Sequence, residues 1–296
     1  MYVFWKPCED YWWTTLLYIN NFHPNEFDKE CMKWTWYLAN DTQFYIIAPG
    51  IIALMMLVQK RCKTMAVLYN FLLIGSMCVI SMVITGIIVG VYNIPALTGD
   101  YILPNNPRAA QVSMIMNRIY TKPYVRIPPY LIGMFLGYLF HKEIKPSKKV
   151  VVFGWLAAFV GAMLVVYGPW KVFKANGSFF TDGENVMYAA THRVVWSCAV
   201  AWVIYACHYQ YGGFVNTILS WKVFMPLSRL TYNTYLLHLM VMVYFVINRA
   251  VPSHYQDSFL VSNVISMTFI TYAMAYILSV LVEFPVVHLE KIAFGR

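Results

Sequence analysis

The chain has 296 residues, of which 60% are hydrophobic, 18% aromatic and only 12% charged. Soluble domains carry about 25% charged residues, so this composition excludes a soluble globular enzyme, a disordered chain and a fibrous protein. The formal net charge is +9. In so apolar a chain, an excess of lysine and arginine is typical of cytosolic loops between membrane helices, and no nucleic-acid partner is expected.

Seven apolar segments follow one another along the chain, and each is predicted to cross a membrane as a helix of roughly 20 residues. The segments are 43–58, 66–92, 124–140, 150–167, 188–208, 228–248 and 259–287. They predict an all-α fold, a polytopic membrane helix bundle with about seven transmembrane helices. Residues 1–42 are expected to form a separate outer segment, and residues 43–296 the transmembrane helical domain in contact with membrane lipids.

The distribution of basic residues predicts the orientation of these helices. The loops after the first, third and fifth segments contain Lys60, Arg61, Lys63, Lys142, Lys145, Lys148, Lys149 and Lys222. Because basic loops usually face the cytosol, we place the N-terminus outside the cell or in a lumen and the C-terminus in the cytosol. The loop between the second and third segments is basic too and departs from this bias. The plasma membrane and the endoplasmic reticulum both fit this arrangement.

The predicted outer regions carry two further signals. Asn176 begins an Asn-Gly-Ser sequon between the fourth and fifth segments, which predicts glycosylation. Cys8 and Cys31 are the only cysteines of the outer segment, in a compartment that permits a disulfide; two free thiols are the alternative.

The first residues are unlike a signal peptide, so we expect the chain to be the C-terminal part of something longer. No cysteine and histidine cluster predicts a metal site.

Four ionisable residues fall near the outer ends of their predicted membrane helices, namely Asp41, Arg126, His192 and Arg193. Ionisable groups at membrane depth are costly and are functional candidates by default. Together they place two cations and one carboxylate in one layer of the membrane, which would suit an anionic ligand or a charged head group, with His192 and Arg193 binding the substrate. The alternatives are an interfacial helix cap for Asp41 and cations that reach the membrane surface for the arginines.

Two more ionisable residues lie within the last two predicted helices. His238 is near the middle of the sixth segment, where a neutral histidine would bond a neighbouring helix or, with an unperturbed pKa near 6.5, transfer protons. Glu283 is the only carboxylate of the seventh segment. We expect Glu283 to be structural, paired with Arg229 or with a helix end.

The sequence around these residues resembles the C-terminal membrane part of the nose-resistant-to-fluoxetine proteins, a branch of the acyltransferase-3 superfamily. The resemblance follows the family order along nearly the whole chain. It is carried by Cys8-Glu-Asp-Tyr-Trp-Trp, Trp36-Tyr-Leu-Ala-Asn-Asp-Thr-Gln-Phe-Tyr, Tyr120-Thr-Lys-Pro-Tyr-Val-Arg, Tyr130-Leu-Ile-Gly-Met-Phe-Leu-Gly-Tyr, Pro226-Leu-Ser-Arg-Leu-Thr-Tyr-Asn-Thr-Tyr-Leu-Leu-His and Glu283-Phe-Pro.

The resemblance implies an acyltransferase that moves acyl groups other than amino-acyl groups onto a hydroxyl-type acceptor, a small molecule or a lipid. Acyl-CoA is the implied donor, and no bound cofactor is implied. Asp41 stands where the wider superfamily usually has glutamate, and Arg126 matches a family arginine, so Asp41, Arg126 and His238 are the catalytic candidates. The family's catalytic arginine–histidine pair lies on an earlier helix that would precede residue 1, and His238 belongs to a later motif.

Two other functions were weighed against the enzyme. The same branch is associated with uptake of lipids and small xenobiotic molecules, and intramembrane histidine and arginine would also line a transport path. Transporters often contain two similar halves, however, and no repeat is visible. A seven-helix receptor is disfavoured because the third segment ends in Tyr138-Leu-Phe-His-Lys, without the acidic-Arg-Tyr triplet of such receptors.

Overall fold

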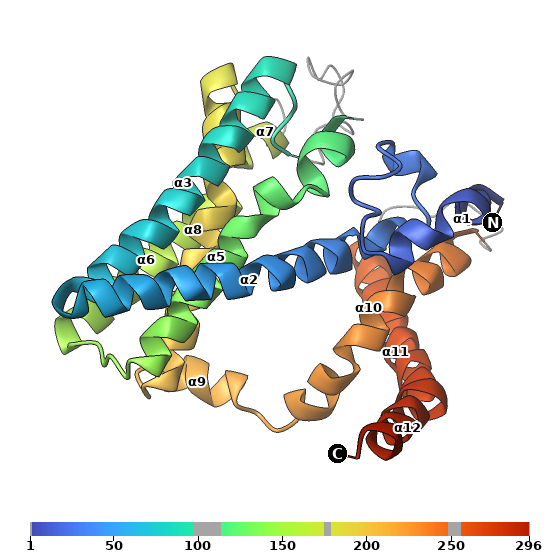
Figure 1. Cartoon of the computed structure of the whole chain (residues 1–296). Helices are drawn as coiled ribbons and strands as arrows, with labels where there is room; N and C mark the ends of the chain where they lie inside the picture. Colours follow the sequence, from blue (N-terminus) through green and yellow to red (C-terminus); the bar gives the residue numbers. More distant parts are fainter. Residues whose placement is uncertain (1, 98–113, 175–178, 248–255, 296) are drawn as a thin grey trace. The chain divides into compact units, whose positions relative to one another are not determined.

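The computed structural model describes residues 2–97, 114–174, 179–247 and 256–295, and within these ranges the regular structure is entirely helical (Figure 1). The α-helices are α1 (Tyr2–Leu16), α2 (Trp36–Arg61), α3 (Ala66–Tyr92), α5 (Pro123–His141), α6 (Lys148–Tyr167), α7 (Trp170–Phe173), α8 (Asp182–His208), α9 (Gly213–Leu219), α10 (Phe224–Ile247), α11 (Asp257–Leu278) and α12 (Phe284–Phe294). Short 3-10 helices are η1 (Phe27–Lys29), η2 (Lys33–Thr35) and η3 (Lys63–Met65), and the π-helices are η6 (Ile115–Tyr120) and η7 (Ser279–Glu283). The predicted all-α fold is confirmed.

Each of the seven predicted segments corresponds to a long helix or, at the C-terminal end, to the run α11–η7–α12. Four stretches of the described chain are long and apolar enough to cross a membrane: Lys33–Arg61, Lys63–Tyr92, Lys148–Phe173 and Asp257–Phe294. The helices α5, α8 and α10 are not among these stretches. The protein is thus an integral membrane protein, and the count of seven crossings stays a prediction.

The chain divides into two compact units, residues 1–213 and 214–296, so the expected boundary at residue 42 falls inside the first unit. In the first unit, α3, α5 and α8 pack against one another. Helix α6 packs on α8, and α2 packs on α3 and α5 (Figure 1). In the second unit, α10 packs on α11, which continues into η7.

Helix α3 shows how the first unit is arranged for an apolar surrounding. Five of its seven buried positions hold small or polar residues, namely Ala66, Asn70, Cys78, Ser81 and Thr85; the other two are Ile74 and Val89. Its large apolar side chains, such as Val79, Ile80 and Ile87, are instead exposed. Membrane helices commonly pack through small and polar residues, because lipid already solvates the large apolar ones. This distribution agrees with a surface covered by lipid.

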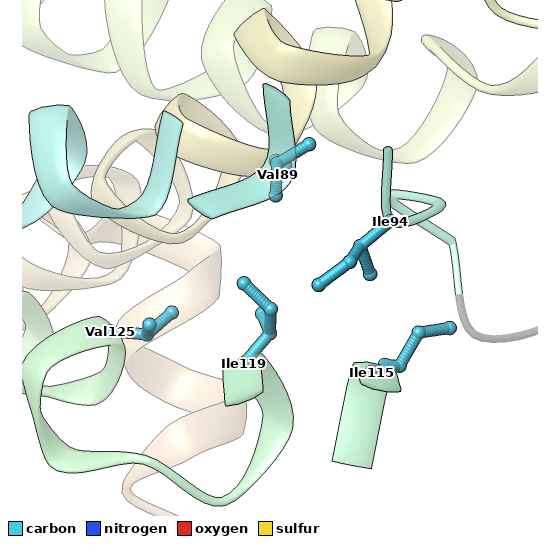
Figure 2. Close-up of a cluster of buried hydrophobic side chains, with 6 residues drawn as sticks. Val89, Ile94, Ile115, Ile119 and Val125 are labelled. Atoms are coloured by element: carbon cyan, nitrogen blue, oxygen red, sulfur yellow. The ribbon is translucent and has the colours of Figure 1, made fainter. Parts of the chain in front are cut away.

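The main apolar cluster lies where α3, η6, α5 and α8 meet (Figure 2). It consists of Val89, Ile94, Ile115, Ile119, Val125 and Ala189. Ile94 follows α3 directly and is fully buried. The cluster therefore fixes the chain segment that leaves α3, together with the first turn of α5, against α8.

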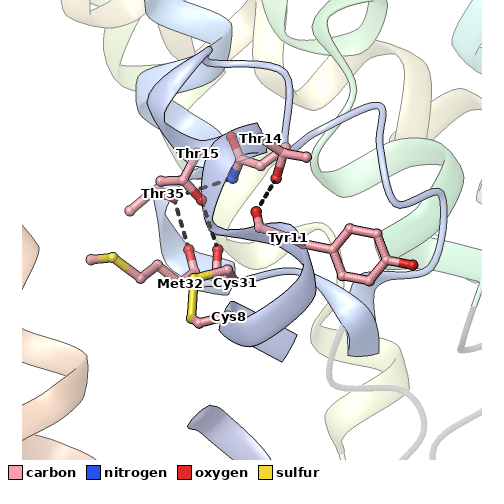
Figure 3. Close-up of a disulfide and its surroundings, with 8 residues drawn as sticks. Cys8, Tyr11, Thr14, Thr15, Cys31, Met32 and Thr35 are labelled. Atoms are coloured by element: carbon pink, nitrogen blue, oxygen red, sulfur yellow. Dashed lines mark hydrogen bonds between the residues drawn. A yellow bond between two sulfur atoms is a disulfide. The ribbon is translucent and has the colours of Figure 1, made fainter. Parts of the chain in front are cut away.

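The N-terminal segment is closed by a disulfide between Cys8 of α1 and Cys31, with an S–S distance of 2.01 Å (Figure 3). The Thr15 hydroxyl donates a hydrogen bond to the Cys31 carbonyl oxygen at 3.2 Å. The Thr35 hydroxyl donates to the carbonyl oxygen of Met32 at 2.8 Å. The disulfide and the Thr15 bond hold α1 to Cys31, and the Thr35 bond closes the turn that leads into α2.

Buried polar side chains attach this segment to the rest of the first unit. Asn21 donates to the Asn40 amide oxygen at 2.8 Å, and Asn40 donates to the Thr121 carbonyl oxygen at 2.9 Å. The Lys122 ammonium donates to the Asn21 carbonyl oxygen. We call these four residues the asparagine junction. Because an unmade buried hydrogen bond is costly, they fix the N-terminal segment to the start of α5.

In the second unit, Glu283 joins helices rather than facing a ligand. Its carboxylate accepts hydrogen bonds from the Asn233 amide at 2.6 Å and from the Ser279 hydroxyl at 2.8 Å. Asn233 lies on α10, so these bonds link α10 to η7. The expected partner was Arg229 or a helix end, and the structure shows an asparagine and a serine instead.

Candidate active site

The first turn of α5 holds Arg126 among aromatic rings. Its Nε donates a hydrogen bond to the Tyr120 carbonyl oxygen at 2.8 Å. Its guanidinium carbon lies 4.7 Å from the Tyr120 ring centroid and 4.9 Å from that of Trp36. Both distances fall in the range of cation–π attraction. The two rings are also in contact with each other, with centroids 5.0 Å apart, so the guanidinium lies against both. It has no carboxylate partner among the described residues, so its charge remains available to an anion.

Helix α8 presents His192 and Arg193 toward the same region. The His192 ring is stacked on that of Tyr188, with centroids 4.9 Å apart and planes 6° from parallel. Its Nδ1 lies 2.6 Å from the Tyr188 carbonyl oxygen. A carbonyl oxygen only accepts, so Nδ1 carries the proton of this bond, and in a neutral ring Nε2 is then a hydrogen-bond acceptor.

Arg193 makes one hydrogen bond, from its guanidinium to the Ala189 carbonyl oxygen of its own helix at 3.2 Å. Its Nε is buried and has no hydrogen-bond partner within the described part of the chain. A buried donor that is left unpaired costs about 1–3 kcal/mol. An oxygen atom of a ligand would remove this cost.

Two features set the position of α8 relative to α3 and η6. Thr181 and Glu184 form a capping box at the helix start, and Lys171 together with Thr181 lowers the pKa of Glu184 to about 2. One turn further, the Asn185 side chain donates to the Ile94 carbonyl oxygen and accepts from the Ala96 amide, both at 2.8 Å. These bonds fix the N-terminal part of α8, which carries His192 and Arg193.

The two helices bring three of the predicted site residues together. The Arg126 charge acts electrostatically on both His192 and Arg193, although Arg126 lies on another helix. We call Arg126, His192 and Arg193 the cationic cluster. Arg126 is the charged side chain near Arg193, and no carboxylate among the described residues forms an ion pair with either arginine. Two like charges held together without a counterion form a site for an anion or for a developing negative charge.

Asp41 does not belong to this cluster. It is exposed on α2, and its electrostatic neighbour is Tyr130 of α5. The buried residue at this place is the preceding one, Asn40, which is 2% exposed and belongs to the asparagine junction. The sequence reasoning chose the ionisable residue of an Asn-Asp pair and missed the asparagine. No signal in a single sequence distinguishes the two, because both suit the first turns of a helix.

His238 belongs to the second unit, and its Nδ1 lies 2.6 Å from the Tyr235 carbonyl oxygen of its own helix. Asn176 falls outside the described residues, so its glycosylation stays a prediction. Among the described residues, no group of three histidine, cysteine, aspartate or glutamate side chains is arranged to hold a metal ion.

The fold and the site together define a class of protein: an all-helical integral membrane protein with a cluster of cations among its helices. The sequence profile of the Acyltransferase domain matches residues 1–286 of the chain. Since this match covers almost the whole chain, the protein belongs to that acyltransferase family. The resemblance to the nose-resistant-to-fluoxetine branch is confirmed by the relatives.

The chain is similar to two curated proteins of Caenorhabditis elegans. It is 29% identical to Nose resistant to fluoxetine protein 6, over 99% of this chain and 36% of that protein. It is 22% identical to Regulator of hypoxia-inducible factor 1, over 73% of this chain and 42% of that protein. The chain therefore spans less than half the length of these relatives. No solved structure gives a significant match.

Proposed function

We propose that this chain is the membrane part of an O-acyltransferase that transfers an acyl group, other than an amino-acyl group, from a donor such as acyl-CoA to a hydroxyl group. The acceptor would be a small molecule or a lipid. The observation that carries the proposal is the cationic cluster, in which Arg193 has a buried, unpaired donor beside a second arginine. The family membership supports the same class of reaction.

The cluster matches the charge that develops in acyl transfer. Attack of a hydroxyl oxygen on the donor carbonyl puts negative charge on the carbonyl oxygen. Collapse of the intermediate breaks the carbon–sulfur bond of a thioester, and the departing thiolate takes up the proton that the hydroxyl loses. Arginine donors placed where this charge appears stabilise the transition state more than the ground state. We assign this role to Arg126 and Arg193. Nε2 of His192 would accept a hydrogen bond from the acceptor hydroxyl.

The first test measures acyl transfer in membranes that contain the protein, with labelled acyl-CoA and a panel of hydroxyl acceptors. We expect Arg193→Met to lower kcat by about 100-fold, the usual effect of removing one oxyanion donor. Arg126→Met should have a similar effect. Arg118→Met is the matched control, since Arg118 also lies over an aromatic ring, 4.1 Å from the Tyr92 centroid, but is exposed and outside the cluster.

Thermal stability separates a functional from a structural role. Arg193 lies near the like charge of Arg126, and its Nε donor is buried without a partner among the described residues. Both features destabilise the fold, so Arg193→Met should unfold at the same or a higher temperature than the parent protein. Lower activity together with lower stability would mean that Arg193 supports the fold instead. Unchanged acyl transfer in both cluster variants would remove the cluster from the reaction. Movement of labelled lipid across the membrane without ester formation would favour the transport alternative.

A further inference from the structure

A second polar site lies at the opposite end of α5 from the cationic cluster. An open pocket of about 1050 Å³ is formed by the end of α2, the start of α3 and the last turns of α5. Arg126 and Lys142 are 16 positions apart along α5, which corresponds to roughly 24 Å of helix. The pocket and the cluster are therefore separate sites, at opposite ends of α5.

Three lysines line the mouth of this pocket: Lys60, Lys63 and Lys142. None of them forms an ion pair within the described ranges of the chain, and no lining residue is an aspartate or glutamate. The Lys142 ammonium lies 6.0 Å from the ring centroid of Tyr138, another lining residue. Without a carboxylate to neutralise them, three ammonium groups around one opening attract an anion.

The floor of the pocket is apolar. We call its two lining methionines, the buried Met55 and the half-buried Met134, the methionine floor, and methionine adapts its shape to irregular apolar ligands. The Tyr138 hydroxyl is buried beside the pocket and makes no hydrogen bond to any residue that the structure describes. This hydroxyl is therefore available to donate a hydrogen bond to an oxygen atom of a ligand, in addition to the lysine ammonium groups. The pocket thus combines cations at its mouth with an apolar interior.

The place of the pocket in the fold indicates the source of such a ligand. Two of the candidate membrane spans meet here, since one ends at Arg61 and the next begins at Lys63. Their ends lie where lipid head groups are found, so phosphate groups are adjacent to the mouth and acyl chains to the floor. Lysines at the ends of membrane helices attract anionic lipids in this way.

We propose that this pocket binds an anionic phospholipid of the adjoining leaflet. Lys60, Lys63 and Lys142 contact its phosphate, the Tyr138 hydroxyl donates to a head-group oxygen, and one acyl chain lies on the methionine floor. We call it the three-lysine pocket. The inference does not depend on acyl transfer, because it uses none of the cationic cluster.

Titration of fluorescent phosphatidic acid into the purified protein in a neutral detergent tests this site, with phosphatidylcholine as the uncharged comparison. We expect preferential binding of phosphatidic acid. The triple variant Lys60→Gln, Lys63→Gln, Lys142→Gln should bind it roughly 100-fold more weakly, at about fivefold for each lysine. The control is Lys145→Gln, Lys148→Gln, Lys149→Gln, which removes the same charge from nearby lysines that do not line the pocket. Its affinity should change by about twofold or less.

A second variant tests the interior rather than the charge. Gly137 lines the pocket, and a Cβ atom at this position would meet no atom within 4 Å. Gly137→Phe should therefore fold normally and fill the space above the floor. We expect it to bind phosphatidic acid at least tenfold more weakly, while its affinity for inorganic phosphate is unchanged.

Three results would overturn the proposal. Equal weakening in the two triple variants would mean general attraction to a basic surface. Undiminished lipid binding by Gly137→Phe would mean that no chain enters the pocket. Binding of acyl-CoA with no binding of phosphatidic acid would assign the pocket to another ligand. Acyl transfer in the Arg193→Met and control proteins is measured separately. A failure of the lipid-binding proposal therefore leaves the proposed acyltransferase function untouched, and a failure of the acyltransferase function leaves the lipid-binding proposal untouched.

Discussion

Glu30 and Lys122 are the most deeply buried ionisable residues outside the membrane helices, at 3% and 6% exposed. Burial raises the pKa of Glu30 to about 8, although Lys122 and Lys33 lower it in part. Burial likewise lowers the pKa of Lys122, which Glu30 partly offsets. Both groups are desolvated, and the charge attraction between them does not fully compensate. Glu30 is therefore protonated at neutral pH.

This protonation makes the stability of the N-terminal segment depend on pH. The folded pKa, about 8, exceeds the ordinary value of 4.5, so the folded protein keeps a proton that the unfolded chain loses. Stability is then highest below about pH 4.5, falls as pH rises to 8, and is level above that. Glu30→Gln stays neutral, so its advantage in unfolding temperature over the parent protein should grow from pH 5 to 8.

Intrinsic tryptophan fluorescence during heating, in detergent, measures this difference. Glu26→Gln is the control, because Glu26 is exposed and pairs only with Lys29 at 3.0 Å. A constant difference between Glu30→Gln and the parent across this pH range would show that Glu30 does not titrate there.

At the scale of single residues, residue type predicted candidates for the site but not how they are grouped. Ionisable groups in apolar segments are rare, and six were candidates on that ground: Asp41, Arg126, His192, Arg193, His238 and Glu283. The structure places Arg126, His192 and Arg193 near one another and leaves Asp41 exposed. The reasoning did not find Asn40, Asn21 or Lys122, which hold the asparagine junction. Asparagines are common at helix starts and in loops, so their type alone carries no sign of burial.

At the scale of helices, the contact between α6 and α8 depends on glycine. A Cβ atom at Gly154 of α6 would overlap the Trp202 ring of α8. Two turns further, a Cβ at Gly161 would come within 3.1 Å of a Val195 methyl group. Glycine permits this close approach, as it does in many pairs of membrane helices. The positions recur on one face of α6 and set its distance from the helix that carries the cationic cluster.

Replacement of Gly154 by leucine tests this contact. The added side chain must displace Trp202 or separate the helices, and we expect destabilisation by about 1–3 kcal/mol, the usual cost of overpacking. The measurement is the unfolding temperature in detergent. Gly133→Leu on α5 is the matched control, because a Cβ there would meet no atom within 4 Å. Equal loss in the two variants would refute the glycine contact.

The helices that carry the candidate site are the ones whose membrane character is weakest. Helices α5 and α8 are not among the four apolar enough to cross a membrane by length and composition. Both pack against α3 and against each other, so part of their surface faces protein. A helix that is partly enclosed by others tolerates polar residues such as Arg126 and Arg193. Apolar content alone therefore underestimates the membrane character of the two helices that carry the candidate site.

At the scale of the whole molecule, the number of crossings determines on which side each end of the chain lies. Seven crossings place the N-terminal segment and the C-terminus on opposite sides, with the basic loops in the cytosol. We expect protease added to intact cells to reach the N-terminal segment and the outer loops but not the C-terminus, and an antibody to the C-terminus to bind only after permeabilisation. Access to both ends from the same side would require an even number of crossings.

The sequence by itself determined the all-α fold, the membrane character, the positions of the long helices and the family. Hydropathy and helical periodicity are local properties, so each can be read along the chain without knowledge of neighbours. Only the tertiary structure decided which polar residues meet: it joined Arg126 to Arg193, left Asp41 exposed and placed three lysines around one pocket. These outcomes depend on how α5 packs against α2, α3 and α8, because residues far apart in sequence become neighbours only through the packing of whole helices.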